Sequence, residues 1–224
     1  MAQDMKCRAI FQIALTFAFV IFTHCLHAQK PDDTIGTIAR NELQSYLQRI
    51  QPGTEKKYGF KTRDEFISAV VGSPIQVFTI HPDSIREIVK PGKSYFVALE
   101  EWKVPVKVGG ELRALLTVAS VGGTLKVVEL GGAELAHELS AVEGKHPGDK
   151  KSLLRLYQLH CDFLVLTHGE KNVSEGDLYP LSSAAIAFPE QRFDKDVSRS
   201  AQRLLPVLRQ KYIDRLRSGV QRNK

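Results

Sequence analysis

Six basic side chains near the C-terminus are the residues best able to bind another molecule. Apolar residues there recur at three- and four-residue spacing over about six turns, which is typical of a long amphipathic helix. The basic side chains lie largely off this apolar stripe: Arg199, Arg203, Arg209, Lys211, Arg215 and Arg217. Such a face suits an envelope protein, an acidic polymer or an anionic membrane surface. The alternative is the solvated outer face of a packed helix.

A second set of residues with reactive types surrounds Cys161, which has His160 and Asp162 as neighbours. A histidine can activate a thiol, but successive side chains of a strand point to opposite faces of a sheet. We therefore expect Cys161 to be a small buried side chain. The Gly-x-Ser-x-Gly pattern of serine hydrolases is absent from the sequence.

The spacing of the histidines does not match that of a metal site either. His137 and Glu138 begin like a zinc-protease motif, but Ala141 stands where the second histidine is needed. Trp102 either lines a groove or, more simply, belongs to the core. We predict no catalytic residue, no metal site and no cofactor.

The N-terminus has the three parts of a secretory signal peptide. Lys6 and Arg8 give it positive charge, and an apolar run follows from Ile13 to Phe22. This run is too short for a membrane span, which needs about 20 apolar residues. We place cleavage after Ala28, so residues 1–28 are the expected leader and the protein is expected in the periplasm or outside the cell.

The composition of the chain is uneven in charge and low in cysteine. The 224 residues carry a net charge of +6, and residues 191–224 alone hold ten Lys or Arg against three Asp. Cys7 and Cys25 would leave with the leader, so Cys161 remains and no intramolecular disulfide can form. The mature chain must be held together by packing, and nucleic acid is not an expected partner of an exported chain.

Three helices are predicted in the first half and at the end of the chain. The first begins at Thr34, which can cap it, and ends at Pro52-Gly53. The second begins at Thr62, with Glu65 at capping-box spacing. The last is the C-terminal helix, which Pro206 interrupts or kinks. A turn of helix is also expected at 84–89.

An antiparallel meander is predicted over residues 94–130. Glycine pairs at 109–110 and 122–123 mark two tight hairpin turns, because both glycines of a pair can take positive φ. The strand before them contains Pro105, which lacks a donor and therefore favours an edge or a bulge. Residues 75–80 are rich in branched side chains and predict a further strand, and a short helix is predicted over 133–142.

The second half of the chain follows a polar stretch, Glu143–Lys151, which marks a possible subdomain boundary. Leu153–Leu159 fits either a helix or a strand. Cys161–Thr167 is a continuous apolar run, typical of a strand that is covered on both faces. Leu181–Phe188 is predicted as another strand.

This order predicts an α+β fold, an antiparallel β-meander sheet packed against helices with a long C-terminal amphipathic helix. Residues 29–224 form one predicted domain, with possible subdomains 29–143 and 150–224. The most direct hypothesis for function is an exported, non-enzymatic binding or interaction module. The alternatives are a hydrolase whose catalytic residues are scattered in sequence, and a membrane-surface protein that uses the basic C-terminal helix.

Overall fold

A computed structural model describes residues 31–80, 95–169, 171–191 and 199–221. The chain divides into two units after Thr34, and the fold described here is that of Ile35–Lys224. Its α-helices, with α2 beginning just before the division, are α2 (Pro31–Gln48), α4 (Ala133–Lys145), α5 (Ser182–Ala187) and α6 (Ala201–Gln221). Its strands are β1 (Val70–Val71), β2 (Ile75–Ile80), β3 (Phe96–Val108), β4 (Glu111–Val121), β5 (Thr124–Gly131), β6 (Lys150–Leu156), β7 (Cys161–Thr167), β8 (Asp177–Pro180) and β9 (Arg199–Ser200). The 3₁₀ turns are η1 (Glu55–Tyr58), η2 (Arg63–Ser68), η3 (Tyr157–Leu159), η4 (Val173–Glu175) and η5 (Pro189–Gln191).

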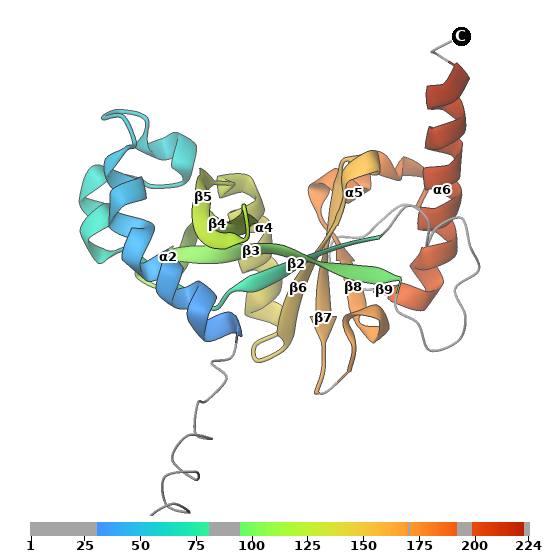
Figure 1. The fold of residues 1–224 in the computed structure, drawn as a ribbon, viewed down its shortest axis with the longest axis horizontal. Coiled ribbons are helices and arrows are strands. Elements are labelled where there is room, and N and C mark those ends of the chain that lie inside the picture. Colours follow the sequence, from blue (N-terminus) through green and yellow to red (C-terminus); the bar gives the residue numbers. More distant parts are fainter. Residues whose placement is uncertain (1–30, 81–94, 170, 192–198, 222–224) are drawn as a thin grey trace, which may run out of the picture. The chain divides into compact units, whose positions relative to one another are not determined.

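All described strands belong to one sheet, in the order β5-β4-β3-β2-β6-β7-β8-β9, with β1 added beside β3. β2 and β6 run parallel, and every other described pair is antiparallel. β2 to β5 and β6 to β8 are two meanders that join through this parallel pair (Figure 1). The predicted α+β fold with a long C-terminal helix is confirmed.

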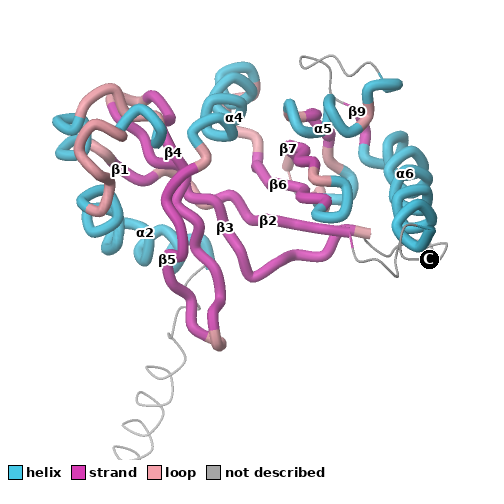
Figure 2. Tube along the Cα trace, turned by 90° about the horizontal axis from the view of Figure 1, so that it is seen from above, coloured by secondary structure: helices cyan, strands magenta, loops and turns pink. Residues whose placement is uncertain are grey.

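Helices cover both faces of the sheet, and neighbouring residues of one strand show how. On β4, Leu116 packs in a core with α2, whereas Leu115 packs in a core with α4. On β7, Phe163 packs in a core with α6, whereas Leu164 joins the α4 core. Because side chains alternate along a strand, α4 lies on the face opposite to that of α2 and α6. Figure 2 shows α4 separated from α2 by the strands.

The two predicted hairpin turns are present. Gly109 and Gly110 have φ of 57° and 85°, a backbone conformation that is strained for residues with a side chain. Gly122 and Gly123, in the second turn, also have positive φ, 62° and 79°. Pro105 is not at an edge of the sheet: β4 lies on one side of β3, and β2 gives way to β1 on the other. The predicted bulge is found next to it, as a register shift between Val106 and Lys107.

Three local predictions were wrong. α2 begins at Pro31, so Thr34 lies inside the helix and does not cap it. Thr62 stands at the N-cap of η2, but the predicted capping box is absent: its side chain makes no cap hydrogen bond, and the Glu65 carboxylate accepts from the Lys61 N–H rather than from that of Thr62. Residues 181–188 are not extended: Ser182–Ala187 form a helix that leaves Ile186 80% exposed while Ala184 and Phe188 are buried beneath α6, whereas a strand would put all three side chains on one face.

α6 continues through Pro206, which stands near its beginning. Three of its side chains are buried at helical spacing, Leu204, Leu208 and Tyr212. None of the described helices is both long and apolar enough to cross a membrane. The predicted leader, 1–28, and the predicted helical turn, 84–89, lie outside the described residues.

Candidate functional site

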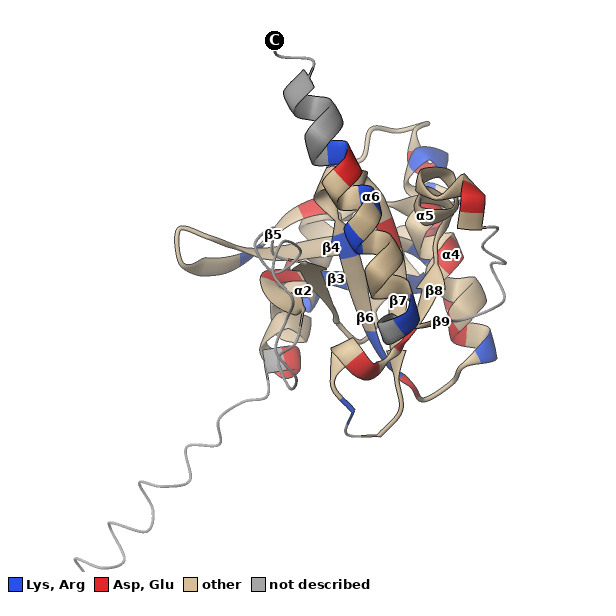
Figure 3. Cartoon of the chain, turned by 90° about the vertical axis from the view of Figure 1, so that its right-hand side faces the viewer, with Lys and Arg blue, Asp and Glu red and all other residues tan. Residues whose placement is uncertain are grey.

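The predicted basic face of α6 is only partly an exposed surface. Arg203 and Arg215 are exposed, while Arg209 and Lys211 are half-buried. Arg199 belongs to β9 rather than to the helix. The side chains of positions 199 and 217 lie outside the description. Figure 3 shows Lys and Arg spaced along α6, whose one acidic residue is Asp214.

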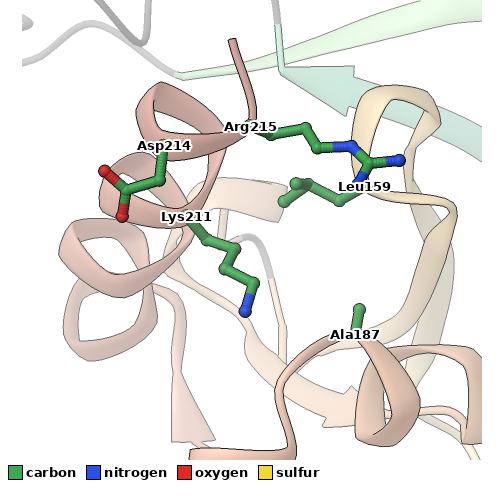
Figure 4. Close-up of a pocket in the computed structure, with 5 residues that line it drawn as sticks. All are labelled: Leu159, Ala187, Lys211, Asp214 and Arg215. Carbon is green, nitrogen blue, oxygen red and sulfur yellow. The ribbon is translucent and has the colours of Figure 1, made fainter. Parts of the chain in front are cut away.

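Two of these cations line a hollow beside α6, which we call the helix pocket. It has a volume of about 450 Å³ and is lined by Leu159, Ala187, Lys211, Asp214 and Arg215. The Lys211 and Arg215 side chains extend toward Leu159 and Ala187, whereas the Asp214 carboxylate points away (Figure 4). Lys211 Nζ lies 3.5 Å from Glu190 Oε1, so part of its charge is already balanced. The helix pocket therefore has an apolar floor and a basic rim.

A second polar cluster crosses the sheet on the face that carries α4. We call it the charge row; its members, from β5 to β7, are Glu129, Thr117, Lys103, Glu101, Arg155 and Asp162. Lys103 is paired with Thr117, and Thr117 with Glu129, in neighbouring strands. Arg155 is paired with Asp162 in the same way. Residues far apart in the chain are thus brought into one line by strand register.

The inner half of the charge row is centred on Lys103, whose side chain is only 8% exposed. Its ammonium donates to Thr117 Oγ1 at 2.8 Å and lies 3.0 Å from Glu101 Oε1. The Thr117 hydroxyl in turn donates to Glu129 Oε2 at 3.4 Å. An ammonium has three donors, and the described residues occupy two of them.

The outer half is centred on Arg155. Its Nε and Nη2 donate to the two carboxylate oxygens of Asp162 at 2.8 and 3.2 Å, a bidentate pair. Its Nη1 lies 3.9 Å from Glu101 Oε1, which joins the two halves. The Tyr157 hydroxyl also donates to Glu101, at 3.3 Å. Glu101 is therefore shared by two cations and a phenol.

A hollow of about 310 Å³ opens over the charge row, at the N-terminus of α4. We call it the charged pocket. Its lining residues are Lys103, Leu115, Thr117, Glu129, Gly131, Gly132, Glu134, Leu135, Arg155 and Asp162. α4 packs on this face of the sheet from Ala136 onward and begins only at Ala133. The polar residues thus occupy the part of the face at the beginning of the helix.

Burial and charge act against each other in the charge row. Burial alone lowers the pKa of the Arg155 guanidinium, but the hydrogen bonds and charge of Asp162 outweigh it and raise that pKa. Burial, together with the charge of Glu101, raises the pKa of the Tyr157 phenol. Arg155 is thus held as a cation and Tyr157 as a neutral donor.

The contact between Lys103 and Thr117 has the distance of a base and a nucleophile. Lys103 Nζ, which lies 3.0 Å from the Glu101 carboxylate, donates a hydrogen bond to the hydroxyl, whereas a base would accept one from it. The hydroxyl itself donates to Glu129. The arrangement is therefore suited to holding polar groups of a ligand.

Cys161 is buried in the core beneath α6. Burial raises the pKa of its thiol to about 12, and the charge of Asp162 adds to this shift. A thiolate is the reactive form, so the thiol is inert at neutral pH. His160 ends η3 with a φ of 52° and precedes the strand. The interpretation of Cys161 as a small buried side chain is confirmed.

His146 and His168 belong to one further polar cluster, around Asp149. Tyr179 Oη and His146 Nε2 are 2.8 Å apart, and His168 Nδ1 lies 2.8 Å from Asp149 Oδ1. His146 Nδ1 is 3.7 Å from the other oxygen of Asp149. Among the described residues, no three His, Cys, Asp or Glu side chains are grouped as a metal site.

Comparisons with family models, with curated proteins and with solved structures find no match to this chain.

Sequence reasoning pointed to the helix pocket, through Lys211 and Arg215, but missed the charged pocket. Lys103 stands in the sequence as one polar member of an alternating strand, between Trp102 and Val104. Such a lysine is expected on the exposed face of a sheet, so the sequence holds no signal for its burial, which the structure shows.

Proposed function

We propose that this protein is an exported binding module and that the charged pocket holds a small polar ligand. The observation that carries the proposal is the burial of Lys103, at 8% side-chain exposure, on the floor of a 310 Å³ hollow. Burying a charge costs several kcal/mol unless it is paired and hydrogen-bonded. Buried charged groups that converge on a hollow are the usual mark of a binding site.

Two features favour ligand binding over a purely structural role. The described residues occupy two of the three ammonium donors of Lys103, so the floor retains hydrogen-bonding capacity. The carboxylates of Glu129 and Glu134 are exposed at the mouth, and neither makes an ion pair with any residue that the structure describes.

Thermal unfolding of the purified protein tests the proposal. The compounds are a panel of small amines, amino acids, dicarboxylates and sugar phosphates. A ligand at 100 times its dissociation constant adds about 2.7 kcal/mol, which raises Tm by roughly 5–10 °C for a chain of this size. We expect at least one compound to raise Tm in the wild type and to fail in the Glu134→Lys variant. Glu134 lines the mouth of the pocket, is exposed and makes no ion pair with a residue that the structure describes, so reversing its charge alters the mouth and leaves the contacts of the sheet in place. A panel without any shift, or a shift that survives in the variant, contradicts the proposal.

Export is the second part of the proposal. It rests on the charged start, the short apolar run and the small residue at Ala28. Expression of the full chain with its own N-terminus should release a form that begins at Gln29. N-terminal sequencing of the exported protein checks this, and a cytoplasmic form that retains Met1 would contradict it.

The helix pocket favours a second candidate function, the binding of an acidic partner. Lys211 and Arg215 rim an apolar floor there, and residues 191–224 hold ten Lys or Arg against three Asp. Binding to a fluorescent poly-glutamate probe should weaken several-fold in Lys211→Glu with Arg215→Glu and fall steeply with salt. Arg203→Glu is the matched control, since Arg203 is exposed on α6 but does not line the pocket. Equal loss in the control would show a general charge effect and contradict a specific pocket. Vesicles with anionic headgroups, titrated in parallel, distinguish a membrane surface from a protein partner.

A further inference from the structure

The charges of the charged pocket differ, with depth, in whether they are paired. The inner cations are paired: the Lys103 side chain, 8% exposed, lies 3.0 Å from Glu101, and that of Arg155, 25% exposed, is held by Asp162, which is 19% exposed. The carboxylates of Glu129 and Glu134 lie at the exposed mouth and make no ion pair with a residue that the structure describes. A ligand that enters this hollow therefore meets unpaired negative charge first and, at the floor, paired cations that still have N–H groups to donate.

The floor of the charged pocket has N–H donors from which an anionic group can accept hydrogen bonds. Lys103 has one N–H beyond those that the described residues occupy, and Arg155 has further guanidinium N–H groups beyond the two that hold Asp162. α4 begins beside them at Gly132, whose φ is 66°, and it has no side-chain cap. The first amides of a helix have no acceptor within it and carry partial positive charge. These amides add to the two side chains but are not needed as a site on their own.

The mouth is built to receive a cationic group. Within the described part of the chain, Glu134 contacts no cation, and Glu129 accepts only the hydroxyl of Thr117. The walls between mouth and floor include the apolar side chains of Leu115 and Leu135. The hollow of about 310 Å³ is at the small end of ligand pockets, which span about 300–1,000 Å³.

From this arrangement we propose that the charged pocket binds a small zwitterion, a free α-amino acid or a short peptide, with its carboxylate at the floor and its ammonium at the mouth. The carboxylate accepts from Lys103 and Arg155, the ammonium donates to Glu129 and Glu134, and an apolar side chain lies against Leu115 and Leu135. This inference rests on the proposed function, because it names the ligand class of the same pocket.

Isothermal titration calorimetry of the purified protein tests the charge pattern. The probes are glycine, leucine, glutamine, aspartate, lysine and the dipeptide Leu-Leu. The probe that binds most tightly is then compared with its C-terminal amide, which lacks the carboxylate, and its N-acetyl form, which lacks the ammonium. We expect each blocked form to bind at least tenfold more weakly than the zwitterion. Tighter binding of Leu-Leu than of leucine assigns the site to short peptides, and the reverse order assigns it to free amino acids.

A pair of variants locates the binding. Glu134→Gln removes one charge at the mouth and should weaken the zwitterion at least fivefold without lowering Tm. Glu42→Gln is the matched control, an exposed glutamate on α2, and it should leave binding unchanged. If Glu134→Gln has no effect, the ammonium does not bind at this mouth and the inference fails.

The failures of the inference and of the proposed function are separate. An amide or N-acetyl form that binds as tightly as the zwitterion shows a site for a cation or an anion alone; this overturns the inference and leaves the binding module. The inference is also overturned if no probe gives a heat of binding at about 10 mM, a concentration well above a dissociation constant of about 1 mM, which is already low affinity. The proposed function then depends on the other compounds of the thermal panel.

Discussion

The charged pocket and the helix pocket differ in how many parts of the chain build them. The charged pocket takes residues from β3, β4, β5, β6, β7 and α4, and its ionic groups contact one another. The helix pocket takes its charged residues from one exposed side of α6. A change in the paired groups of the first, Lys103, Arg155 or Asp162, must disturb the sheet as well as a ligand, whereas a change in the second should disturb binding alone. The effect of a variant on unfolding stability should therefore distinguish the two pockets.

The largest expected effect is from Lys103→Met. It removes the cation between Thr117 and Glu101 and leaves the Glu101 carboxylate, which is 21% exposed, with Arg155 as its remaining cation at 3.9 Å. Breaking a buried pair costs about 3–5 kcal/mol, and partial exposure reduces this to about 2–4 kcal/mol. Urea unfolding measures the loss. Lys211→Met in the helix pocket is the matched control and should change stability by less than about 0.5 kcal/mol. Equal losses in the two variants would remove the distinction between the pockets.

The next effect concerns the core between the sheet and α6. The pKa of the Cys161 thiol is raised from 9.0 to about 12, so the unfolded chain loses this proton at lower pH than the folded chain. Stability from this group is complete below pH 9 and is lost as pH rises toward 12. By about pH 10.5 the loss should be about 2 kcal/mol. Urea unfolding at several pH values measures it, and Cys161→Ala should flatten the profile above pH 9. An unchanged profile in Cys161→Ala would show that another group titrates.

A smaller effect is expected from Asp162→Asn. The change removes the charge that holds Arg155 in a bidentate pair and should cost about 1–2 kcal/mol. Asp214→Asn is its counterpart in the helix pocket, where the carboxylate accepts from Gln210 at an exposed position. That variant should stay within about 0.5 kcal/mol of the wild type. Thermal unfolding of both variants in one buffer gives the comparison, and a larger loss in Asp214→Asn would reverse our account of which pocket is structural.

The sequence was sufficient for the parts of the fold that depend on local pattern. The Gly109-Gly110 turn, the strand 75–80 and the apolar run of Cys161–Thr167 are all found as predicted. Residues 181–188 were mistaken for a strand because a short apolar run fits both periods. Tertiary packing decides there, since a helix can bury Ala184 and Phe188 while it exposes Ile186, and a strand cannot.

The charged pocket could not be read from the sequence because it depends on register. The Gly109-Gly110 turn pairs Lys107 with Leu112, and an uninterrupted hairpin would continue that register. The bulge at Val106/Lys107 moves it by one residue, so that Lys103 pairs with Thr117. A second shift at Thr117/Val118 then places Glu129 opposite Thr117. A one-residue slip turns side chains to the other face, so these bulges decide which polar groups meet.

The helix pocket shows the opposite case. The basic residues were visible as a periodic pattern, but the pattern did not reveal which of them share a hollow. Of the predicted basic residues whose side chains the structure describes, only Lys211 and Arg215 line the helix pocket.

The central claim, that a small ligand binds at the N-terminus of α4 and not beside α6, is tested most directly by amide chemical shifts. The zwitterion that binds most tightly is titrated into ¹⁵N-labelled protein. The account predicts saturable shifts at the amides of Gly131, Gly132 and Glu134, with Lys211 and Arg215 unchanged. Shifts confined to α6, or no saturable shift at the N-terminus of α4, would contradict it.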